Sequence, residues 1–472
     1  MSFWRIKPLD AILATAEKKS LHRSLGPVQL TLLGIGAVIG TGIFVLTAAA
    51  AQKAGPGMMV SFIIAGAVCA VAALCYSELA SMVPVAGSAY TYSYSALGEI
   101  IAWIVGWALI LEYSLACSTV AVGWSAHLVG FLEYITGLHL PPALLNGPFA
   151  GGLVNLPAVL VSLAVMGLLL IGARESATLN IFLVIIKIVA LGAFVFLAFP
   201  AIKAGNYDPF APFGYLAHQV GDKKVGILAA TAVVFFAFFG FDAVSTSSEE
   251  AKNPNRDLTI GIMGSMAVST LIYMLVAATA VGALPFKEIA ASGEPLPHIL
   301  RSVNHPMVAG LVGAAAIVAL PSVILVMMYG QSRIFFVMAR DGLLPSVVAK
   351  VNSKGSPALI TLLTGLFVAV FAGFVPLEEI ASLSNAGTLI AFVAVCLSMI
   401  VLRVKKPELP RVFKTPVFWL TGPLAIAGCI FIFSGLRLQS QEFTLAWMAI
   451  GLVFYFSYGR WNSRLRKEAK QG

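Results

Sequence analysis

The residues most able to do chemistry in this chain are glycines that interrupt its first long apolar run. Four of them fall within nine positions: Gly34, Gly36, Gly40 and Gly42. Each costs about 1 kcal/mol relative to alanine in a helix interior, so we expect the helix to break near the middle of the run. Inside hydrocarbon, unpaired backbone N–H and C=O groups are tolerated only where they are buried in protein or line a polar cavity. The stretch is therefore a candidate binding site.

A broken helix offers partial charges of both signs to a ligand. The N–H groups of Gly40, Thr41 and Gly42, which open the second half-helix, could hold a carboxylate. The carbonyl of Ile39, which closes the first half-helix, could receive an ammonium group. Together they would suit the two backbone charges of an amino acid zwitterion. The alternative is close helix packing on small residues, and it applies above all to the two earlier glycines.

A second interruption occurs in a later apolar run, from Phe235 to Asp242. We expect the carbonyls of Phe236, Ala237 and Phe239 to add to the ammonium side of the site. The two phenylalanines beside the break could also form an apolar lid, although aromatic residues in membrane helices more often serve packing. We expect Asp242 to order the broken backbone rather than to touch a ligand directly.

Two charged residues lie within apolar runs and are candidates for handling a proton. Lys187 is about three turns from the charged pair Arg174 and Glu175, too deep to reach water easily. It could alternate between an ammonium that grips carbonyls of the first span and a neutral amine that releases them; the alternative is a structural cation that ties helices together. Glu112 could be a second proton site, a partner for a cation, or a hydrogen-bonded carboxyl at a helix interface.

The composition indicates what must position these residues. Of the 472 residues, 59% are hydrophobic and 11% are charged, whereas soluble chains carry about 25% charged residues. We therefore predict an all-α polytopic membrane protein. Apolar runs of about 20 residues predict twelve spans, at 28–52, 57–83, 98–126, 153–173, 176–199, 226–250, 258–284, 307–339, 356–375, 379–403, 416–437 and 441–459.

The basic residues predict the orientation. If both termini are cytoplasmic, 22 of the 30 lysines and arginines fall on the cytoplasmic side and 7 on the outside, with Lys187 inside a span. This bias follows the positive-inside rule and accounts for the net charge of +9 without nucleic acid. The cysteines and histidines show no metal-ligand spacing, and no nucleotide motif follows any glycine loop, so we expect no metal, no cofactor and no enzyme activity.

Two breaks five spans apart are the pattern of an inverted repeat, with both broken helices at one site near the midplane. The predicted organisation is a cytoplasmic segment 1–27, a first five-helix repeat 28–199, an external loop 200–225, a second repeat 226–403, a cytoplasmic linker 404–415, two peripheral helices in 416–459 and a cytoplasmic basic tail 460–472.

Five segments of the chain resemble the amino acid-polyamine-organocation (APC) superfamily, and within it the bacterial members of the cationic amino acid transporter family. They are Gly34 to Phe44, Cys75 to Tyr94, Gly172 to Ala177, Phe235 to Pro254 and Met338 to Pro345. The resemblance implies the five-plus-five inverted-repeat fold, with Gly40, Thr41 and Gly42 at the substrate carboxylate. Lys187 matches a lysine that, in bacterial relatives, stands where sodium-coupled cousins bind sodium. In the eighth span, Ser322 and Met327 are candidates for the substrate pocket.

From these residues and this resemblance we expect an importer of L-amino acids, small and neutral or cationic, that is coupled to protons and works by alternating access. The expected location is the bacterial inner membrane, with lipids and a small membrane accessory subunit as further partners. An exchanger is the alternative within the same class. A channel or a receptor is a different class; a channel would lack saturable uptake, and a receptor would carry a soluble output domain.

Overall fold

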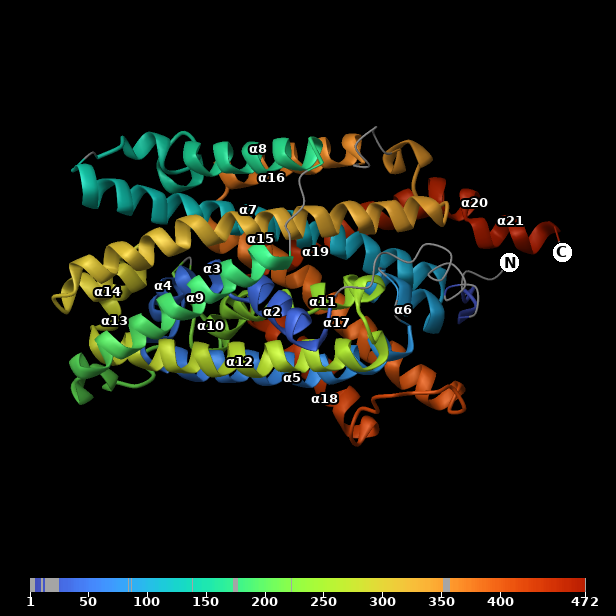
Figure 1. Ribbon diagram of the computed structural model, residues 1–472, viewed down its shortest axis with the longest axis horizontal. Coiled ribbons are helices and arrows are strands. Elements are labelled where there is room, and N and C mark those ends of the chain that lie inside the picture. Colours follow the sequence, from blue (N-terminus) through green and yellow to red (C-terminus); the bar gives the residue numbers. More distant parts are fainter. Residues whose placement is uncertain are drawn as a thin grey trace.

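The structure is a computed structural model that describes residues 5–9, 12, 25–83, 85, 87–137, 139–172, 177–221, 223–350 and 357–471. Long helices run side by side along the longest axis of the molecule (Figure 1). Apart from short 3-10 turns and one π turn, the regular structure of these residues is α-helical, with a single two-stranded hairpin. The predicted all-α class is confirmed.

The helices of the first half of the chain are α2 (Pro27–Val38), α3 (Thr41–Phe44), α4 (Leu46–Ala54), α5 (Met58–Met82), α6 (Ser88–Ala96), α7 (Glu99–Thr136), α8 (Leu156–Leu170) and α9 (Ala177–Ala198). The strands β1 (His218–Val220) and β2 (Lys223–Val225) then form an antiparallel hairpin. The second half holds α10 (Ile227–Val234), the 3-10 turn η6 (Phe235–Phe238), α11 (Ala243–Thr246), α12 (Pro254–Ala283), α13 (Phe286–Ala290), α14 (Pro295–Ser302), α15 (Pro306–Arg340), α16 (Ala358–Phe374) and α17 (Leu377–Lys405). The chain ends with α18 (Phe418–Gly435), α19 (Leu438–Phe454), α20 (Arg460–Asn462) and α21 (Arg464–Gln471).

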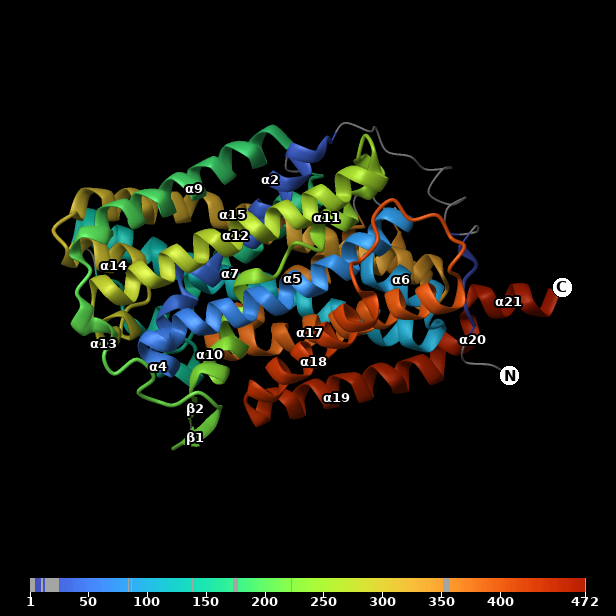
Figure 2. The same ribbon diagram turned by 90° about the horizontal axis from the view of Figure 1, so that it is seen from below.

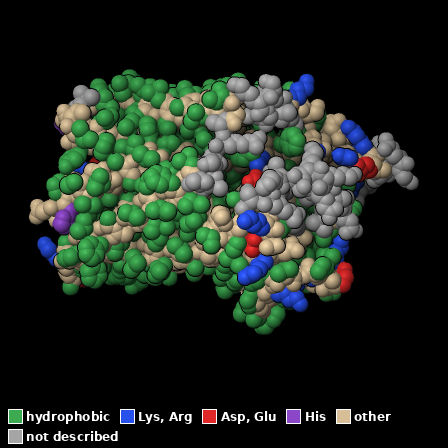
Figure 3. Space-filling model, viewed as in Figure 1, with side chains coloured by type: hydrophobic (Ala, Val, Ile, Leu, Met, Phe, Trp, Pro, Cys, Tyr) green, Lys and Arg blue, Asp and Glu red, His purple; other side chains and the backbone are tan. Residues whose placement is uncertain are grey.

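Every predicted span falls on helical structure. Among the described residues, eight helical runs are long and apolar enough to cross a membrane, and three shorter apolar helices accompany them: α2, α8 and α16. The count of twelve spans stays a prediction, because the other predicted spans fall on helices that are broken or short. Hydrophobic side chains cover most of the face in Figure 3, and charged side chains gather at one end of it.

The beginning and the end of the chain meet at that charged end. The Lys7 ammonium lies 2.7 Å from a carboxylate oxygen of Asp341, at the end of α15. The backbone N–H of Arg464, at the start of α21, donates to the carbonyl of the same aspartate. Both ends of the described chain therefore attach to one point on one side, as an even number of spans requires.

The broken helices approach the middle from opposite ends. The short α2 enters from the end where the termini lie, whereas α10 follows the hairpin at the opposite end (Figure 2). The long helices α7, α12, α15 and α17 surround them, so the irregular backbone at the two breaks is buried in protein. This is the arrangement in which unwound backbone is tolerated inside a membrane.

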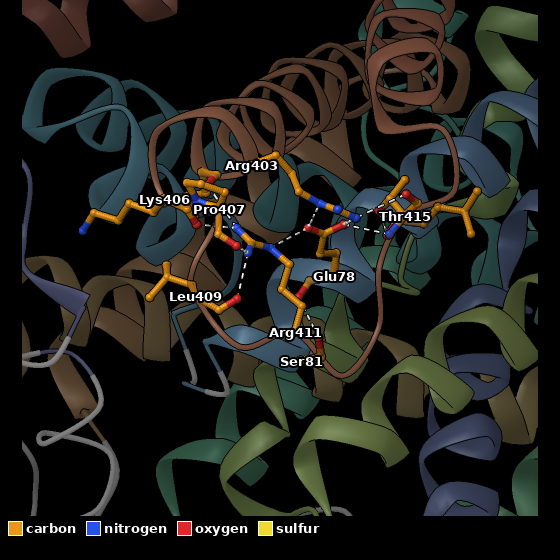
Figure 4. Close-up of polar contacts among 10 residues, drawn as sticks. Glu78, Ser81, Arg403, Lys406, Pro407, Leu409, Arg411 and Thr415 are labelled. Carbon is orange, nitrogen blue, oxygen red and sulfur yellow. Dashed lines mark hydrogen bonds and ion pairs between the residues drawn. The ribbon is translucent and has the colours of Figure 1, made fainter.

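Glu78 anchors the linker between α17 and α18 (Figure 4). Its buried carboxylate accepts hydrogen bonds from the Arg403 guanidinium at 2.6 and 2.9 Å, from Arg411 at 3.1 Å and from the backbone N–H of Thr415 at 2.8 Å. Arg411 also donates to the carbonyls of Pro407 and Leu409. The cluster fixes the linker to the end of α5 and stands apart from the breaks.

Candidate functional site

The first break lies at Ile39 and Gly40. The helix α2 ends at Val38, the next two residues adopt non-helical backbone angles, and α3 begins at Thr41. The expected interruption within Gly34 to Phe44 is therefore present. The two earlier glycines lie inside α2 and serve packing: a Cβ on Gly34 would lie 2.6 Å from Ser265 of α12, and one on Gly36 would lie 2.6 Å from the side chain of Asn180 in α9.

The second break runs from the end of α10 to the start of α11. The 3-10 turn η6 follows Val234, Phe239 is extended, and Gly240 has a φ of +110°. Few residues other than glycine adopt such an angle, so this glycine is needed for the chain to turn there. The sequence located this break correctly as well.

The two breaks touch each other directly. A Cβ added to Gly42 would lie 2.2 Å from the Cα of Ala237, and one added to Gly240 would lie 2.9 Å from the carbonyl carbon and oxygen of Ala37. Each break therefore carries a glycine where the other break's backbone passes. The contact brings the start of α3 next to η6, as a shared site requires.

A small cavity of about 10 Å³ remains where the breaks meet, and it is largely enclosed. From the breaks, it is lined by Ala37, Val38, Gly40, Thr41, Gly42, Phe236 and Phe239. Ala116 and Val120 of α7 and Val323 and Met327 of α15 complete the lining. All the side chains around it except that of Thr41 are apolar.

The polar groups at this cavity are backbone groups and one hydroxyl. The N–H groups of Gly40, Thr41 and Gly42 donate no backbone hydrogen bond beyond their own helix among the described residues, and a helix beginning here leaves its first N–H groups without intrahelical acceptors. The Thr41 hydroxyl is fully buried and has no hydrogen-bond partner in the described part of the chain. The start of α3 thus offers donors that a bound carboxylate would satisfy.

Two side chains hold the carbonyl end of α2. The Lys187 ammonium, 1% exposed, donates to the carbonyl of Gly36 at 2.8 Å. The Tyr273 hydroxyl of α12 donates to the carbonyl of Val38 at 2.7 Å. Because these carbonyls lost their intrahelical partners at the break, the two donors stabilise the interrupted conformation.

The acidic candidates lie beside the cavity without lining it. Asp242 accepts a hydrogen bond from the Tyr113 hydroxyl at 3.1 Å, while its other carboxylate oxygen has no partner among the described residues. Glu112 is 1% exposed, and one of its carboxylate oxygens is also without a partner there. It packs against Gly387 of α17. Neither residue is part of the cavity lining.

The structure brings most of the predicted binding residues together, but four of them do not line the cavity: Asp242, Ser322, Ile39 and Ala237. The Ser322 hydroxyl donates to the carbonyl of Ala319 in its own helix at 2.9 Å. Ile39 and Ala237 are buried behind the lining, where Ala237 contacts Gly42. Met327 does line it, one turn beyond Val323.

Sequence reasoning missed the aliphatic side of the cavity. Ala116 and Val120 are four residues apart on α7, and Val323 and Met327 are four apart on α15, so each pair occupies one helix face. That spacing could have extended the choice of Met327 to Val323. No pattern distinguishes Ala116 and Val120 from the other apolar residues of α7.

A wider hollow of about 570 Å³ lies on the hairpin side of the cavity, between α7, α14 and the start of α17. Its lining includes Val45 and Val122 as well as Glu133, Glu288 and Glu294. Burial raises the pKa of Glu294 above its ordinary value, although the Arg301 guanidinium, 2.5 Å away, opposes the shift.

In the described ranges, no three His, Cys, Asp or Glu side chains gather as a metal site would require. The polar groups at the first break are backbone ends, the hydroxyls of Thr41 and Tyr273 and the ammonium of Lys187.

Known proteins resemble this chain over most of its length. The family model described as amino acid permease matches residues 25–456. The branched-chain amino acid permease BcaP of Bacillus subtilis is 45% identical over 463 residues, covering 97% of each chain. The methylthioribose transporter of the same organism is 41% identical and covers 99% of this chain and 100% of its own. The vacuolar cationic amino acid transporter 4 of Arabidopsis thaliana is 36% identical over 82% of this chain and 64% of its own length.

Proposed function

Because the chain belongs to the amino acid permease family, we propose that it is a secondary active importer of neutral aliphatic L-amino acids that is coupled to protons. The single observation that carries the proposal is the contact between the two breaks. Free N–H groups at the start of α3 and backbone carbonyls at the ends of α2 and η6 lie around one small cavity. An amino acid zwitterion has a carboxylate that would bind the N–H groups and an ammonium that would bind the carbonyls.

The lining of the cavity supports a neutral substrate. Its helical walls present Ala116, Val120, Val323 and Met327, and no acidic side chain lines it. A cationic substrate would bring a charge into this apolar surface without a counter-charge, which is unfavourable. The 45% identity to a branched-chain amino acid permease supports the same choice. In contrast, arginine or lysine would fit a pocket in which a carboxylate faced the side chain.

The position of Lys187 supports proton coupling. Its ammonium donates to the Gly36 carbonyl in the last turn of α2. In the proposed cycle, loss of the proton would weaken this bond and release α2, and regaining it would restore the bond. Because Gly36 precedes the cavity residues Ala37 and Val38, movement of α2 would change the substrate site. Proton binding and substrate binding would thus act on one helix end.

The proposed location is the bacterial inner membrane, with both termini in the cytoplasm. The half of the molecule that contains α21 carries most of the charged side chains on the face in Figure 3, as expected from the positive-inside rule. Substrate would then enter through the hollow beside α14. Membrane lipids are the surrounding partners, and an accessory subunit stays an expectation.

Reconstitution into liposomes tests the proposal. With no amino acid inside, an inward proton gradient should drive accumulation of labelled L-isoleucine or L-alanine above the external concentration. L-Arginine and methylthioribose should compete weakly at equal concentration. Uptake that appears only after internal amino acid is supplied would instead indicate an exchanger. Strong competition by arginine would contradict the neutral substrate class.

A further inference from the structure

The carbonyl end of α10, where the second break begins, has a donor of its own. The side-chain amide nitrogen of Asn385, on α17, donates to the carbonyl of Ala232 at 2.7 Å and lies 3.3 Å from that of Val233. Asn385 is fully buried. Because only the nitrogen of this amide can donate, it must face the two carbonyls.

The arrangement repeats that of the first break. Lys187 and its acceptor Gly36 are 151 residues apart, and Asn385 and its acceptor Ala232 are 153 residues apart. In the two predicted repeats, 28–199 and 226–403, each donor lies in the last helix and each acceptor lies in the first. The fifth helix of each half therefore caps the broken helix that begins that half.

The two donors differ in the one property that matters for coupling. Lys187 ends in an ammonium that can lose a proton, whereas the Asn385 amide keeps its hydrogens at any physiological pH. The amide oxygen of Asn385 is buried without a partner among the described residues. Since an unsatisfied buried acceptor is costly, the side chain is better explained by its donor group than by general polar packing.

We propose that Asn385 is the uncharged counterpart of Lys187, a positioning residue that holds the end of α10 so that Phe236 and Phe239 line the substrate cavity. The inference rests on the proposed function. It assigns the response to protons to the first break alone, while the second break stays capped throughout the cycle. The contacts between the substrate and the backbone carbonyls of η6 would then stay the same throughout the cycle.

The variant Asn385→Asp tests the assignment because it changes the amide nitrogen to oxygen at constant size. An ionised carboxylate would face two carbonyl oxygens and repel them, whereas the protonated form can donate once. Four buried ionisable groups on the neighbouring elements interact with one another: Glu112 and Tyr113 of α7, Tyr76 of α5 and Asp242 at the break. All four are also present in the wild type, whose own pH profile supplies the baseline.

The measurement is the dissociation constant of purified protein for L-isoleucine or L-alanine at pH 5.5 and pH 8, by calorimetry. We expect the Asn385→Asp variant to bind about tenfold more weakly at pH 8 than at pH 5.5, after division by the wild-type ratio. The matched control is Ser398→Ala on the same helix, whose hydroxyl donates to the Ala394 carbonyl one turn earlier. It should follow the wild type at both values.

Wild-type affinity of Asn385→Asp at both pH values, together with equal affinities of Asn385→Gln and Asn385→Met, would overturn the inference while leaving the proposed function intact. If the variant cannot be purified, Asn385→Gln and Asn385→Met, of similar length, decide the matter: glutamine should bind at least about fivefold more tightly than methionine, and equal affinities would overturn the assignment. A wild-type protein that binds neither amino acid contradicts the proposed function. In that case the melting temperature of ligand-free Asn385→Asp still tests the hydrogen bond, and must fall from pH 5.5 to pH 8 relative to wild type.

Discussion

The two breaks of this transporter are alike in backbone and different in what holds them. Both end a short helix near the centre of the molecule, and each places a glycine against the other's backbone. The first is capped by a buried ammonium and a phenol hydroxyl, the second by a buried amide. The comparison teaches that one geometry can be built with a titratable donor or with a fixed one. In the proposed mechanism only the first can report the proton gradient.

The largest effect is expected at the titratable donor. A gradient of about 2 pH units can drive about hundredfold accumulation when one proton accompanies each substrate, because each unit is worth a factor of ten. Lys187→Met keeps the length of the side chain without its charge and should abolish this accumulation. Lys187→Gln restores an uncharged donor and should bind substrate more tightly than Lys187→Met by calorimetry, without restoring pH-driven uptake. Equal accumulation by Lys187→Met and wild type would show that the lysine is structural.

The contact between the breaks should be the next most sensitive feature. Gly42→Val would place side-chain atoms on the Ala237 backbone, and overpacking of this kind costs about 1–3 kcal/mol. We expect affinity for L-isoleucine to fall about ten- to hundredfold. Gly192→Ala, where an added Cβ meets nothing within 4 Å, is the control. Unchanged affinity in the Gly42 variant would mean that the breaks separate when substrate binds.

The second donor on the first break should have a smaller effect. Tyr273→Phe keeps the ring contacts with Phe62 and Phe238 and removes only the hydroxyl that donates to Val38. One lost hydrogen bond of about 1 kcal/mol predicts about a fivefold weaker affinity. The pH dependence of uptake should stay that of the wild type, since Lys187 is untouched. A changed pH profile would show that the hydroxyl shares in proton coupling.

Much of this arrangement could be predicted from the sequence. Clustered glycines and an acidic residue within apolar runs located both breaks, because backbone strain and membrane depth are properties of single segments. Tyr273 and Asn385 could not be found in the same way. Each donates to a carbonyl far away in the chain, and no local pattern distinguishes a capping phenol or amide from an ordinary buried polar residue.

The pocket residues show the same limit of prediction from sequence. Ser322 and Met327 were equal candidates on one helix, and only the rotation of α15 in the packed structure separates them. The exact partners of a helix face depend on the neighbouring helices, which a single sequence does not specify. The predicted contact of Lys187 with the first span is present in the structure, whereas its role in coupling stays a prediction.

A moderate effect on selectivity is expected from the cavity wall. Val323→Ala would remove two methyl groups from the lining and enlarge a cavity of only about 10 Å³. A change of one or two methylene-sized groups is worth about 1–3 kcal/mol in selectivity. The ratio of uptake rates for L-phenylalanine and L-alanine should rise about tenfold. A ratio that does not change would place the substrate side chain against another wall.

The smallest effect is expected at Ser322. Its hydroxyl bonds to its own helix and lies outside the lining, so Ser322→Ala should bind L-isoleucine within about twofold of the wild type. A fall of tenfold or more would show that α15 rotates to bring this hydroxyl to the substrate during the cycle.

The central claim is that substrate movement carries protons through Lys187. It is tested most directly by adding L-isoleucine to weakly buffered proteoliposomes that contain a pH-sensitive dye. With wild-type protein, the account predicts acidification of the lumen that saturates with substrate, and with Lys187→Met it predicts none while labelled substrate still equilibrates. Equal acidification by the two proteins, or substrate uptake by the wild type without acidification, would contradict it.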